Sequence, residues 1–444
     1  MKTTFLSILS AALLAGSAAS GAQAPTAPDP KPAAADGLTR SEAIRIALAY
    51  NPAAARSRSE TEVAELQVRR ARSSILPQVT VDGRYTRNQE EISFDFDGNE
   101  VAILPADDWS TSIRLAQPVY AGGRELKAIR QARLGVEASE HAERGTRETV
   151  LFDVASNFLN VLGAESLVAV EQQNVELATR TRKQAADFYE AGEVTRVDVL
   201  RAESSIKAAE RQLAAGRQAR EAAASLLRLA LGVDVPIDPE SPQLALPQIP
   251  AEQELIALAE QNRPDIRRAI IAERVANLEV GKQRGAYLPL VTAEASFTQQ
   301  AAAFPTDQFG ALTLNFSMPI FTSGEIPARV ASAREQERQA ELMLDQARQG
   351  VREDIRRALV ELETARTALA LAIEQRDAAE AEYQQIFELY RAQEATSLDV
   401  QSAEATLAAA RRNVVTGTLD RDLAELRVWY ATGALETVLL KETS

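Results

Sequence analysis

Residues 75–80 read ILPQVT, and residues 287–292 read YLPLVT. A longer landmark, YEAGEVTRVDVLRAE at 189–203, returns as YRAQEATSLDVQSAE at 390–404. The landmarks come in the same order in both halves, so the chain contains two tandem structural repeats of roughly 200 residues. Solenoid units are only about 20 to 50 residues long, so each copy must be a module of several helices or strands.

The spacing between matching residues changes once along the chain. Pro52 and Pro264 lie 212 positions apart, whereas Pro118 and Pro319 lie 201 positions apart. The first copy is therefore eleven residues longer between the Leu-Pro landmark and Pro118. We expect this extra stretch to form a surface loop, because loops tolerate insertions.

The N-terminus has the features of a secretory signal peptide. Lys2 precedes an apolar run from Phe5 to Ala15, and Ala22-Gln23-Ala24 is a small-residue cleavage site. We therefore expect residues 1–24 to be removed and the mature protein to work outside the cytoplasm. Residues 25–37 contain four prolines and many alanines, which is typical of a flexible lead.

Composition excludes several classes of protein. The chain has no cysteine and a single histidine, His141, which argues against disulfides, metal sites and a lipid-acylated cysteine. Its 49 basic and 63 acidic residues give a net charge of -14, and phosphate binding needs a basic surface, so nucleic acid is not an expected partner. No nucleophile and base stand in a recognisable arrangement. We expect no catalytic residues, no cofactor and no metal.

Two long stretches predict helices that continue far beyond the size of a compact domain. Residues 124–190 contain no proline, nor do residues 328–392, and each would extend for roughly 100 Å. In the second stretch apolar residues recur every seven positions, as at Leu344 and Val351, which is typical of a coiled-coil seam. After a short polar turn each stretch is followed by a second helix. The predicted return helices are 197–232 and 398–433.

Four shorter helices complete the helical part. Residues 52–74 and 264–286 have the length to stack end to end on the return helices. Residues 41–50 and 252–261 are amphipathic and would be side helices. The sequence therefore predicts two helical hairpins with unequal arms, each extended by a short helix.

Between the short and the long helices the apolar period changes to two. Val291, Ala293 and Ala295 alternate with Thr292 and Glu294, which predicts strands with one apolar and one polar face. The same pattern occurs at residues 312–318 and, in the first copy, at 79–85 and 112–115. Such strands also occur at the edge of a soluble sandwich.

Aromatic residues mark the ends of the predicted strands. Trp109 and Tyr120 are eleven residues apart, and Phe309 and Phe321 are twelve apart. A tilted membrane strand needs about 9 to 11 residues and carries an aromatic girdle at each interface. Four strands leave open edges and cannot close a barrel, whereas three chains with four strands each would close one with twelve.

At these landmarks the chain resembles the TolC-like outer-membrane efflux protein family, the outer membrane factors of tripartite efflux and secretion systems. The resemblance covers essentially the whole mature chain. It is carried by Asn51-Pro52, Leu76-Pro77, Leu288-Pro289, QPVYAGGR at 117–124, MPIFTSG at 318–324, and the turn Tyr189 to Gly192 with Asp198-Val199-Leu200. It implies a homotrimer with a twelve-stranded outer-membrane barrel and a periplasmic tunnel of coiled coils. The implied partners are a periplasmic adaptor (membrane fusion protein), an inner-membrane transporter and outer-membrane lipid.

We therefore expect a mixed fold of all-α coiled coil plus transmembrane β, organised as two repeats. The first repeat spans 38–235, with strands at about 78–119 and a helical hairpin at about 124–231. A linker at 236–250 leads to the second repeat at 251–435, with strands at about 289–321 and a hairpin at about 326–432. Residues 436–444 would be a C-terminal tail.

The resemblance places the periplasmic entrance of the channel at the two hairpin tips. It implies a pore constriction at Asp399 and Ser402, although Asp399 could simply be an acidic residue at a helix N-terminus. We expect Asp198 to take part in contacts between hairpins. The expected adaptor contacts are Ala191, Gly192, Glu193, Val194, Thr195, Asp198, Val199, Gln393, Glu394, Ala395 and Thr396.

Three residues depart from the family pattern. Ser402 stands where a second acid is common, and Ala395 stands where a basic residue is often found, so these positions do not indicate how the closed entrance is latched. Gln393 replaces the glycine that the first tip has as Gly192, and a positive φ is less easily accommodated there. The first tip, 191–199, is therefore the better-preserved expected adaptor contact.

These features predict a passive outer-membrane channel of a Gram-negative-type bacterium, with a periplasmic extension. It would export small molecules such as drugs or other toxic compounds from a tripartite pump. Three alternatives remain: the exit duct of a type I protein secretion system, a non-channel periplasmic coiled-coil adaptor or structural protein, and a secreted enzyme. The arginines on the short helix, Arg56, Arg58, Arg69, Arg70 and Arg72, are interpreted as a solvated or intersubunit face.

Overall fold

The computed structural model describes residues 38–96, 99–237, 246–301 and 308–441. The chain divides into two units, Met1–Ala35 and Asp36–Ser444, and all described residues belong to the second. The expected signal peptide and lead lie outside the described residues, as do parts of the expected linker and tail.

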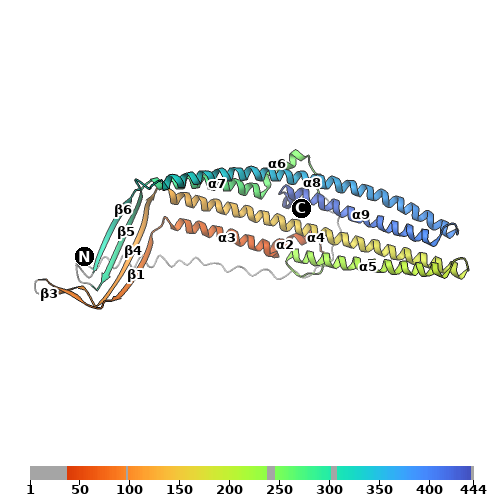
Figure 1. The fold of residues 1–444 in the computed structure, drawn as a ribbon, viewed down its shortest axis with the longest axis horizontal. Coiled ribbons are helices and arrows are strands. Elements are labelled where there is room, and N and C mark those ends of the chain that lie inside the picture. Colours follow the sequence, from red (N-terminus) through yellow and green to blue (C-terminus); the bar gives the residue numbers. More distant parts are fainter. Residues whose placement is uncertain (1–37, 97–98, 238–245, 302–307, 442–444) are drawn as a thin grey trace. The chain divides into compact units, whose positions relative to one another are not determined.

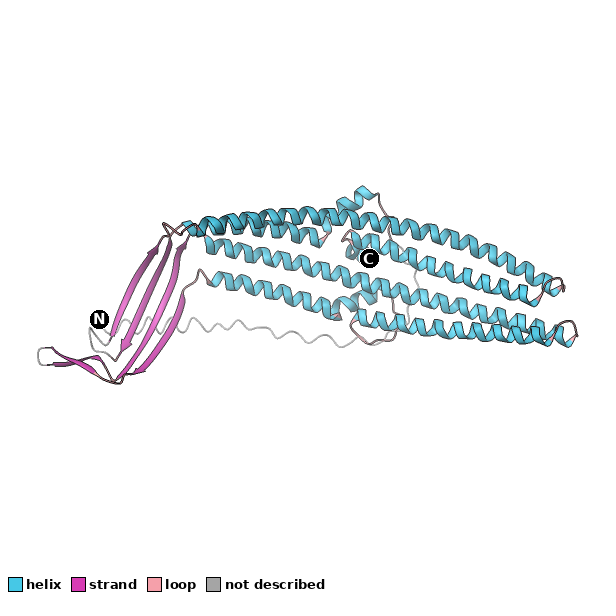
Figure 2. Cartoon of the chain, viewed as in Figure 1, coloured by secondary structure: helices cyan, strands magenta, loops and turns pink. Residues whose placement is uncertain are grey.

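Both repeats have the same order of elements, with the strands following the short helix (Figures 1 and 2). The first repeat contains α2 (Arg40–Tyr50), α3 (Pro52–Ser73), β1 (Gln78–Arg87), β2 (Ile92–Phe96), β3 (Asn99–Leu104), β4 (Asp107–Ala121), α4 (Arg124–Glu190) and α5 (Arg196–Leu231). The second contains α6 (Glu252–Asn262), α7 (Pro264–Arg284), the short 3-10 turn η1 (Gly285–Tyr287), β5 (Leu290–Gln300), β6 (Gln308–Ser317), α8 (Glu325–Arg391), α9 (Ser397–Ala431) and α10 (Leu435–Lys441). The predicted tandem repeat is confirmed.

The eleven extra residues of the first copy do not form a loop without regular structure. They lie in a ribbon in which β2 pairs antiparallel with β3, with Phe94 opposite Val101 and Asp95 opposite Glu100. Apolar Ile92 and Phe94 alternate with polar neighbours, which is a strand pattern inside the insertion. The described residues thus contain six strands instead of the expected four, and four of the six form one sheet.

That sheet has the order β1-β4-β5-β6, with every pair antiparallel. Val81 lies opposite Ile113, Ile113 opposite Phe297, and Ala295 opposite Leu312, so these apolar side chains share one face. Within the described chain, the outer edges of β1 and β6 have no partner strand. The sheet is therefore open at both edges.

A bulge in β4 determines which face of the sheet Tyr120 lies on. Pro118 lies opposite Thr292, but the next paired residue is Tyr120, opposite Val291, and Val119 is left over. Trp109 and Tyr120 consequently share the apolar face, although their odd spacing would otherwise place them on opposite faces.

The long helices pack as two antiparallel hairpins, α4 with α5 and α8 with α9, and α4 also packs against α9. Most of the predicted seam in α8 is buried, including Val351, Ile355 and Leu362. Phe158, Leu227 and Leu426 belong to one core where both hairpins meet α2 and α10. Tyr383, Tyr390 and Leu407 form a separate core near the tips. Leu255 and Val428 belong to a third core, beside α6.

The short helices stack end to end on the return helices, as predicted. The Asn51 side chain donates to the Ala230 carbonyl at the end of α5 (2.7 Å), and Arg263 donates to the Ala431 carbonyl at the end of α9 (3.1 Å). Gly232 has φ +75°, and a Cβ there would lie 2.7 Å from the Tyr50 carbonyl oxygen. This joint therefore requires glycine, both for its conformation and for the close approach.

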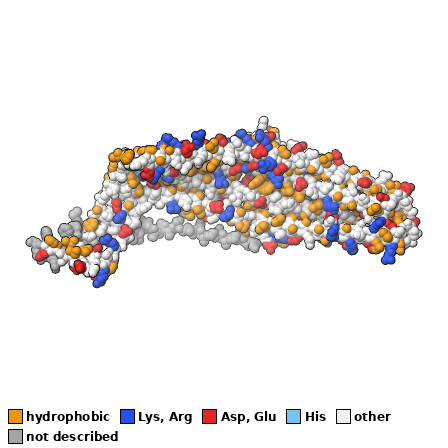
Figure 3. Space-filling model, in the orientation of Figure 1, with side chains coloured by type: hydrophobic (Ala, Val, Ile, Leu, Met, Phe, Trp, Pro, Cys, Tyr) orange, Lys and Arg blue, Asp and Glu red, His pale blue; other side chains and the backbone are white. Residues whose placement is uncertain are grey.

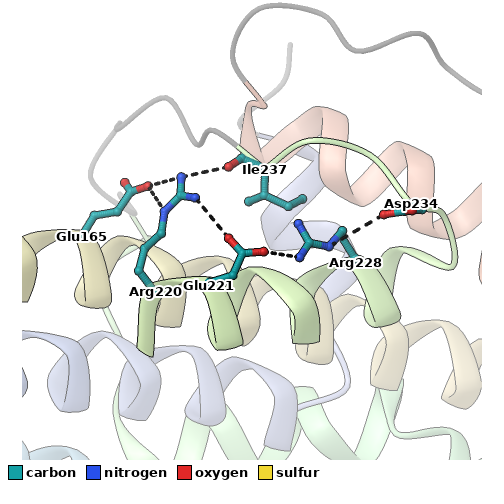
Figure 4. A network of polar contacts seen from close by, with 6 residues as sticks. All are labelled: Glu165, Arg220, Glu221, Arg228, Asp234 and Ile237. Atoms are coloured by element: carbon teal, nitrogen blue, oxygen red, sulfur yellow. Dashed lines mark hydrogen bonds and ion pairs between the residues drawn. The ribbon is translucent and has the colours of Figure 1, made fainter. Parts of the chain in front are cut away.

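Polar contacts hold the segment that leaves the first repeat (Figure 4). Arg220 on α5 donates to the Glu165 carboxylate on α4 (2.9 Å) and to the Ile237 carbonyl (2.9 Å). Arg228 binds Glu221 (2.6 Å) and lies 3.9 Å from Asp234. Residues 232–237 are thereby fixed against the first hairpin.

The C-terminal residues expected as a tail contain the helix α10. Its first turn is capped from another element, because buried Glu148 on α4 accepts hydrogen bonds from the Leu435 and Glu436 amides (3.1 and 3.3 Å). Arg147 forms an ion pair with Glu436. In the part of the chain that the structure describes, no helix has the length and hydropathy to cross a membrane.

Candidate channel entrance and strand surface

The two hairpin tips have the same backbone. Gly192 donates to the Tyr189 carbonyl and Glu193 to the Phe188 carbonyl, and in the second tip Gln393 and Glu394 donate to Tyr390 and Leu389. These distances are all between 2.8 and 3.0 Å. Because the long helices end in the same way, residues 201 positions apart occupy equivalent places in the two tips.

Gln393 adopts the left-handed conformation that Gly192 adopts, with φ +62° against +80°. A side chain in this region costs about 1 to 2 kcal/mol relative to the right-handed conformation. The second tip therefore keeps the turn although its residue has a side chain.

Both return helices begin with a capping box. Asp198 Oδ2 accepts from the Thr195 amide (3.1 Å) and hydroxyl (2.7 Å), and Asp399 Oδ2 accepts from the Thr396 amide (2.9 Å) and hydroxyl (2.6 Å). The expected helix N-terminal role of these aspartates is thus present in both copies. Their pKa values are held below the ordinary range, first by the Ser397 hydroxyl for Asp198 and by the Thr396 hydroxyl for Asp399.

The second carboxylate oxygen distinguishes the two aspartates. Asp198 Oδ1 accepts from the Ser397 hydroxyl of the other hairpin at 2.5 Å, so the expected contact of Asp198 between hairpins is present. Asp399 is exposed, and its Oδ1 atom has no hydrogen-bond partner among the described residues. The second copy thus presents a free acceptor where the first is engaged.

A buried polar seam continues from the tips along the contact between α4 and α9. Arg412 binds Glu171 (3.1 Å), Asn174 donates to the same carboxylate (3.1 Å), and Thr181 donates to Glu404. Burial raises the pKa of Glu404. The seam joins the two hairpins of one chain, and the sequence did not reveal it because its members come from distant positions.

The expected constriction and adaptor residues lie together at the tips. Asp399 and Ser402 are one helical turn apart and both are exposed. The exposed adaptor candidates are Ala191, Gly192, Glu193, Thr195, Gln393, Glu394 and Thr396, whereas Val194, Asp198, Val199 and Ala395 are half-buried. Large apolar side chains that sequence reasoning missed are also exposed here: Val197, Leu200 and Leu398. Val197 and Leu398 are each the second residue of a return helix, and an apolar residue at this position was the sequence signal that could have revealed them.

The strand surface has two chemically different faces. Its polar face carries the ion pairs Arg114 with Glu294 (2.9 Å) and Arg84 with Asp108 (3.5 Å). Its apolar face has no cover in the described chain, and Leu312 and Leu314 are 84% and 69% exposed. Figure 3 shows further hydrophobic side chains at the corner between the strands and α8.

The four aromatic residues expected at the strand ends have different places. Trp109 and Tyr120 lie at opposite ends of β4 on the apolar face. Phe309 lies opposite Thr298 and therefore on the polar face, opposite to the face of Trp109 and Tyr120. It is three positions from Leu312, and odd spacing in a regular strand reverses the face. Phe321 lies between β6 and α8, outside the sheet, and is 85% exposed.

Among the described residues, no group of three or more histidine, cysteine, aspartate or glutamate side chains is placed to hold a metal ion. The geometry thus consists of an open sheet with one apolar face, joined to paired helical hairpins whose tips present carboxylates and apolar side chains.

Comparison with known proteins identifies the class. The model of the family described as Outer membrane efflux protein matches residues 43–233 and 255–434. The chain belongs to this family, and its location is the outer membrane.

Particular relatives support this assignment. The Outer membrane efflux protein BepC of Brucella suis is 26% identical over 388 residues, which cover 85% of this chain and 82% of BepC. Protein CyaE of Bordetella pertussis is 24% identical over 352 residues, covering 77% and 73%. In each case most of both chains takes part in the match.

Solved structures show that the fold is shared. The crystal structure of CusC superposes with a TM-score of 0.77 at 18% identity, covering 93% of this chain and 98% of CusC. The open state of the Neisseria gonorrhoeae MtrE outer membrane channel gives 0.74 at 20% identity, covering 89% and 88%. The chain has the TolC-like fold, as the sequence predicted.

Proposed function

We propose that three copies of this chain form a passive outer-membrane channel that receives small molecules from an inner-membrane transporter through a periplasmic adaptor. The observation that carries the proposal is the sheet of β1, β4, β5 and β6, which has two open edges and an uncovered apolar face. In hydrocarbon every backbone polar group needs a partner, so such a sheet is stable only when its edges are closed by further strands. Three sheets joined edge to edge give a closed barrel of twelve strands.

The dimensions of the sheet fit this assignment. β1 and β6 have ten residues each, and β5 has eleven. Tilted membrane strands of about 9 to 11 residues span the hydrocarbon layer. The apolar face would meet lipid, and the polar face with Arg114 and Glu294 would line a water-filled lumen.

The helical hairpins would form the periplasmic part of the duct. Three chains contribute six hairpins of two alternating kinds around one axis. Asp399 and Ser402 would form the constriction, where three copies of each side chain surround the axis. The tips at 191–199 and 393–396 would be the contact for the adaptor, with exposed Val197 and Leu200 as additional apolar contacts.

The substrate class proposed is small toxic molecules. Relatives from Pseudomonas putida are named as outer membrane proteins of a solvent efflux pump and of a toluene efflux pump, and each matches over 264 residues. In this proposal the transporter selects the cargo, because a wide duct need not recognise what passes through it.

Reconstitution in planar bilayers tests the proposal. The purified protein should be a detergent-solubilised trimer found in outer-membrane fractions, and it should give discrete single-channel conductance steps. A monomer that stays soluble without detergent, or a membrane trimer without conductance, would contradict it. Restoration of solvent or drug resistance in a strain lacking its own outer-membrane channel tests the substrate class separately.

A further inference from the structure

A strongly basic band surrounds the place where the helices meet the strands. We define this junction band as residues 66–76, 121–131, 276–288 and 318–330. It contains nine arginines and lysines but only three carboxylates, a net charge of +6 in a chain whose total is -14. The cations are Arg69, Arg70, Arg72, Arg124, Lys127, Arg130, Lys282, Arg284 and Arg329.

The topology brings all four segments of the band to one end of the sheet. α3 leads into β1 and α7 leads into β5, whereas β4 leads into α4 and β6 leads into α8 (Figure 1). The segments from the two repeats touch, because a Cβ at Gly122 would lie 2.2 Å from the Gly285 carbonyl oxygen. The positive charges therefore form one band and are not scattered along the chain.

Few of these cations are neutralised by the protein. Lys282 binds Glu279 (3.1 Å) and Arg329 binds Glu325. The guanidinium groups of Arg69, Arg70, Arg72, Arg130 and Arg284 are on exposed residues and have no hydrogen-bond or ion-pair partner among the described residues. These five arginines are therefore neither buried nor paired within the chain.

The helix dipole accounts for only part of the band. Cations in the last turn of α3 and α7, such as Arg72 and Arg284, are favoured by the negative C-terminal end of a helix. Arg124, Lys127 and Arg130 instead lie in the first two turns of α4, where the dipole favours anions. Arg124 donates to the Ala121 carbonyl (2.9 Å), and the Lys127 side chain packs beside Gly281 of α7. Neither of these contacts neutralises a positive charge, and Arg130 is exposed without a partner among the described residues.

The band also has an apolar rim on the strand side. Ile320 and Phe321 are 96% and 85% exposed, and Tyr287 and Leu76, in the segments that lead from α7 and α3 into the strands, are exposed as well. Exposed apolar side chains and exposed guanidinium groups within the same band match the boundary between acyl chains and headgroups.

We propose that the junction band binds the anionic headgroups of phospholipids in the periplasmic leaflet, with phosphatidylglycerol as the type of ligand. This inference rests on the proposed channel, because the apolar sheet face sets the depth of the band. Guanidinium groups pair with phosphate through two parallel N–H donors, and basic residues at a membrane surface each add to the attraction for anionic lipid. Three chains would surround the barrel with a positive collar that fixes its vertical position.

Lipid retention by purified trimers tests the proposal. The trimer in neutral detergent is incubated with equal amounts of phosphatidylglycerol and phosphatidylcholine, and bound lipid is counted by native mass spectrometry. We expect at least fivefold preference for phosphatidylglycerol, largely lost in R69Q/R70Q/R72Q. The control R56Q/K183Q/R217Q also removes three positive charges, but outside the band, and should keep the preference.

The outcomes separate this inference from the proposed function. Equal retention of both lipids, or unchanged preference in R69Q/R70Q/R72Q, would overturn the lipid band. The proposal would also be overturned if inorganic phosphate at the same concentration displaced bound phosphatidylglycerol as effectively as free phosphatidylglycerol does, because the site would then recognise phosphate alone. Single-channel conductance of the same preparations in phosphatidylcholine bilayers reports on the channel itself, and loss of conductance in the parent protein would instead reject the proposed function.

Discussion

Asp198 Oδ1 and Ser397 Oγ lie 2.5 Å apart and join the tips of the two hairpins. Asp198 simultaneously caps its own helix through Oδ2, so one carboxylate fixes both the start of α5 and its position against α9. Hydrogen bonds to a charged group are stronger than those between neutral groups, which makes this contact a specific link at the proposed entrance.

Ser397→Ala should loosen this link without removing the capping box. The lost hydrogen bond is worth about 1 kcal/mol, so the fraction of time that the channel spends open should rise about fivefold. Single-channel recording measures this fraction. Ser204→Ala, an exposed serine on α5, is the control and should behave like the parent. Equal open times in the parent and Ser397→Ala would show that the contact does not restrain the entrance.

The Asp198 pKa gives this link a pH dependence. Its folded-state pKa lies below the ordinary 3.8, chiefly because of the Ser397 hydroxyl, so the contribution to stability is present above pH 3.8 and is lost as pH falls through the lower folded value. Channel opening should therefore be insensitive to this group between pH 5 and 8. An opening transition in that window that disappears in Asp198→Asn would contradict the assignment.

Gly192 and Gln393 provide a matched pair for testing backbone strain. Both have positive φ, and a Cβ at Gly192 would meet no atom within 4 Å, so Gly192→Ala tests conformation alone. The Gly192→Ala substitution should lower the stability of the first tip by about 1 kcal/mol. Gln393→Gly should stabilise the second tip by less than Gly192→Ala destabilises the first, because glycine also loses more entropy on folding. Hydrogen exchange of amides 189–195 and 390–396 measures both effects, and equal changes in the two tips would rule out this account.

Glu148 links stability to pH through α10. Burial is the main reason that its pKa is raised from 4.5 to about 6, and Glu436 and Arg144 are its charged neighbours. The folded state therefore holds this proton more tightly than the unfolded chain, so its contribution is fully present below pH 4.5 and declines by about 2 kcal/mol as pH rises through 6. Thermal midpoints in detergent at pH 4.5 to 7 should show this decline in the parent, not in Glu148→Gln. Glu140→Gln, at an exposed position, should retain it.

The sequence predicted the parts of the fold that repeat or are periodic. The Leu-Pro landmarks, the seam through Val351 and the glycine stop at Gly232 each follow from local chemistry that a single segment contains. The face of Tyr120 depended on a bulge at Val119, which no local pattern specifies, whereas the face of Phe309 follows from its odd spacing to Leu312 within one strand. Contacts such as Asp198 with Ser397 or Glu148 with α10 join distant segments, and no local pattern specifies them.

The repeat itself predicts a contact between subunits. Within one chain Asp198 meets Ser397, and in the proposed trimer Asp399 of one chain would take the equivalent place against Arg196 of the next, because Arg196 is the repeat mate of Ser397. Arg196 is exposed and has no partner among the described residues, and Asp399 has a free Oδ1. A guanidinium would thus face a carboxylate at all three subunit boundaries.

Reversal of the two charges tests this contact. Arg196→Asp should place two carboxylates together and raise the open fraction at least tenfold, as should Asp399→Arg, whereas Arg196→Asp combined with Asp399→Arg should return it toward the parent value. The capping box of α9 needs Asp399, so Asp399→Asn serves as a control that keeps an acceptor for Thr396. Single-channel recording of these variants in 0.1 and 1 M salt gives a second criterion, since the single-variant effects should shrink as salt screens the charges. Additive effects in the double variant would place Arg196 and Asp399 in separate environments and exclude the pairing.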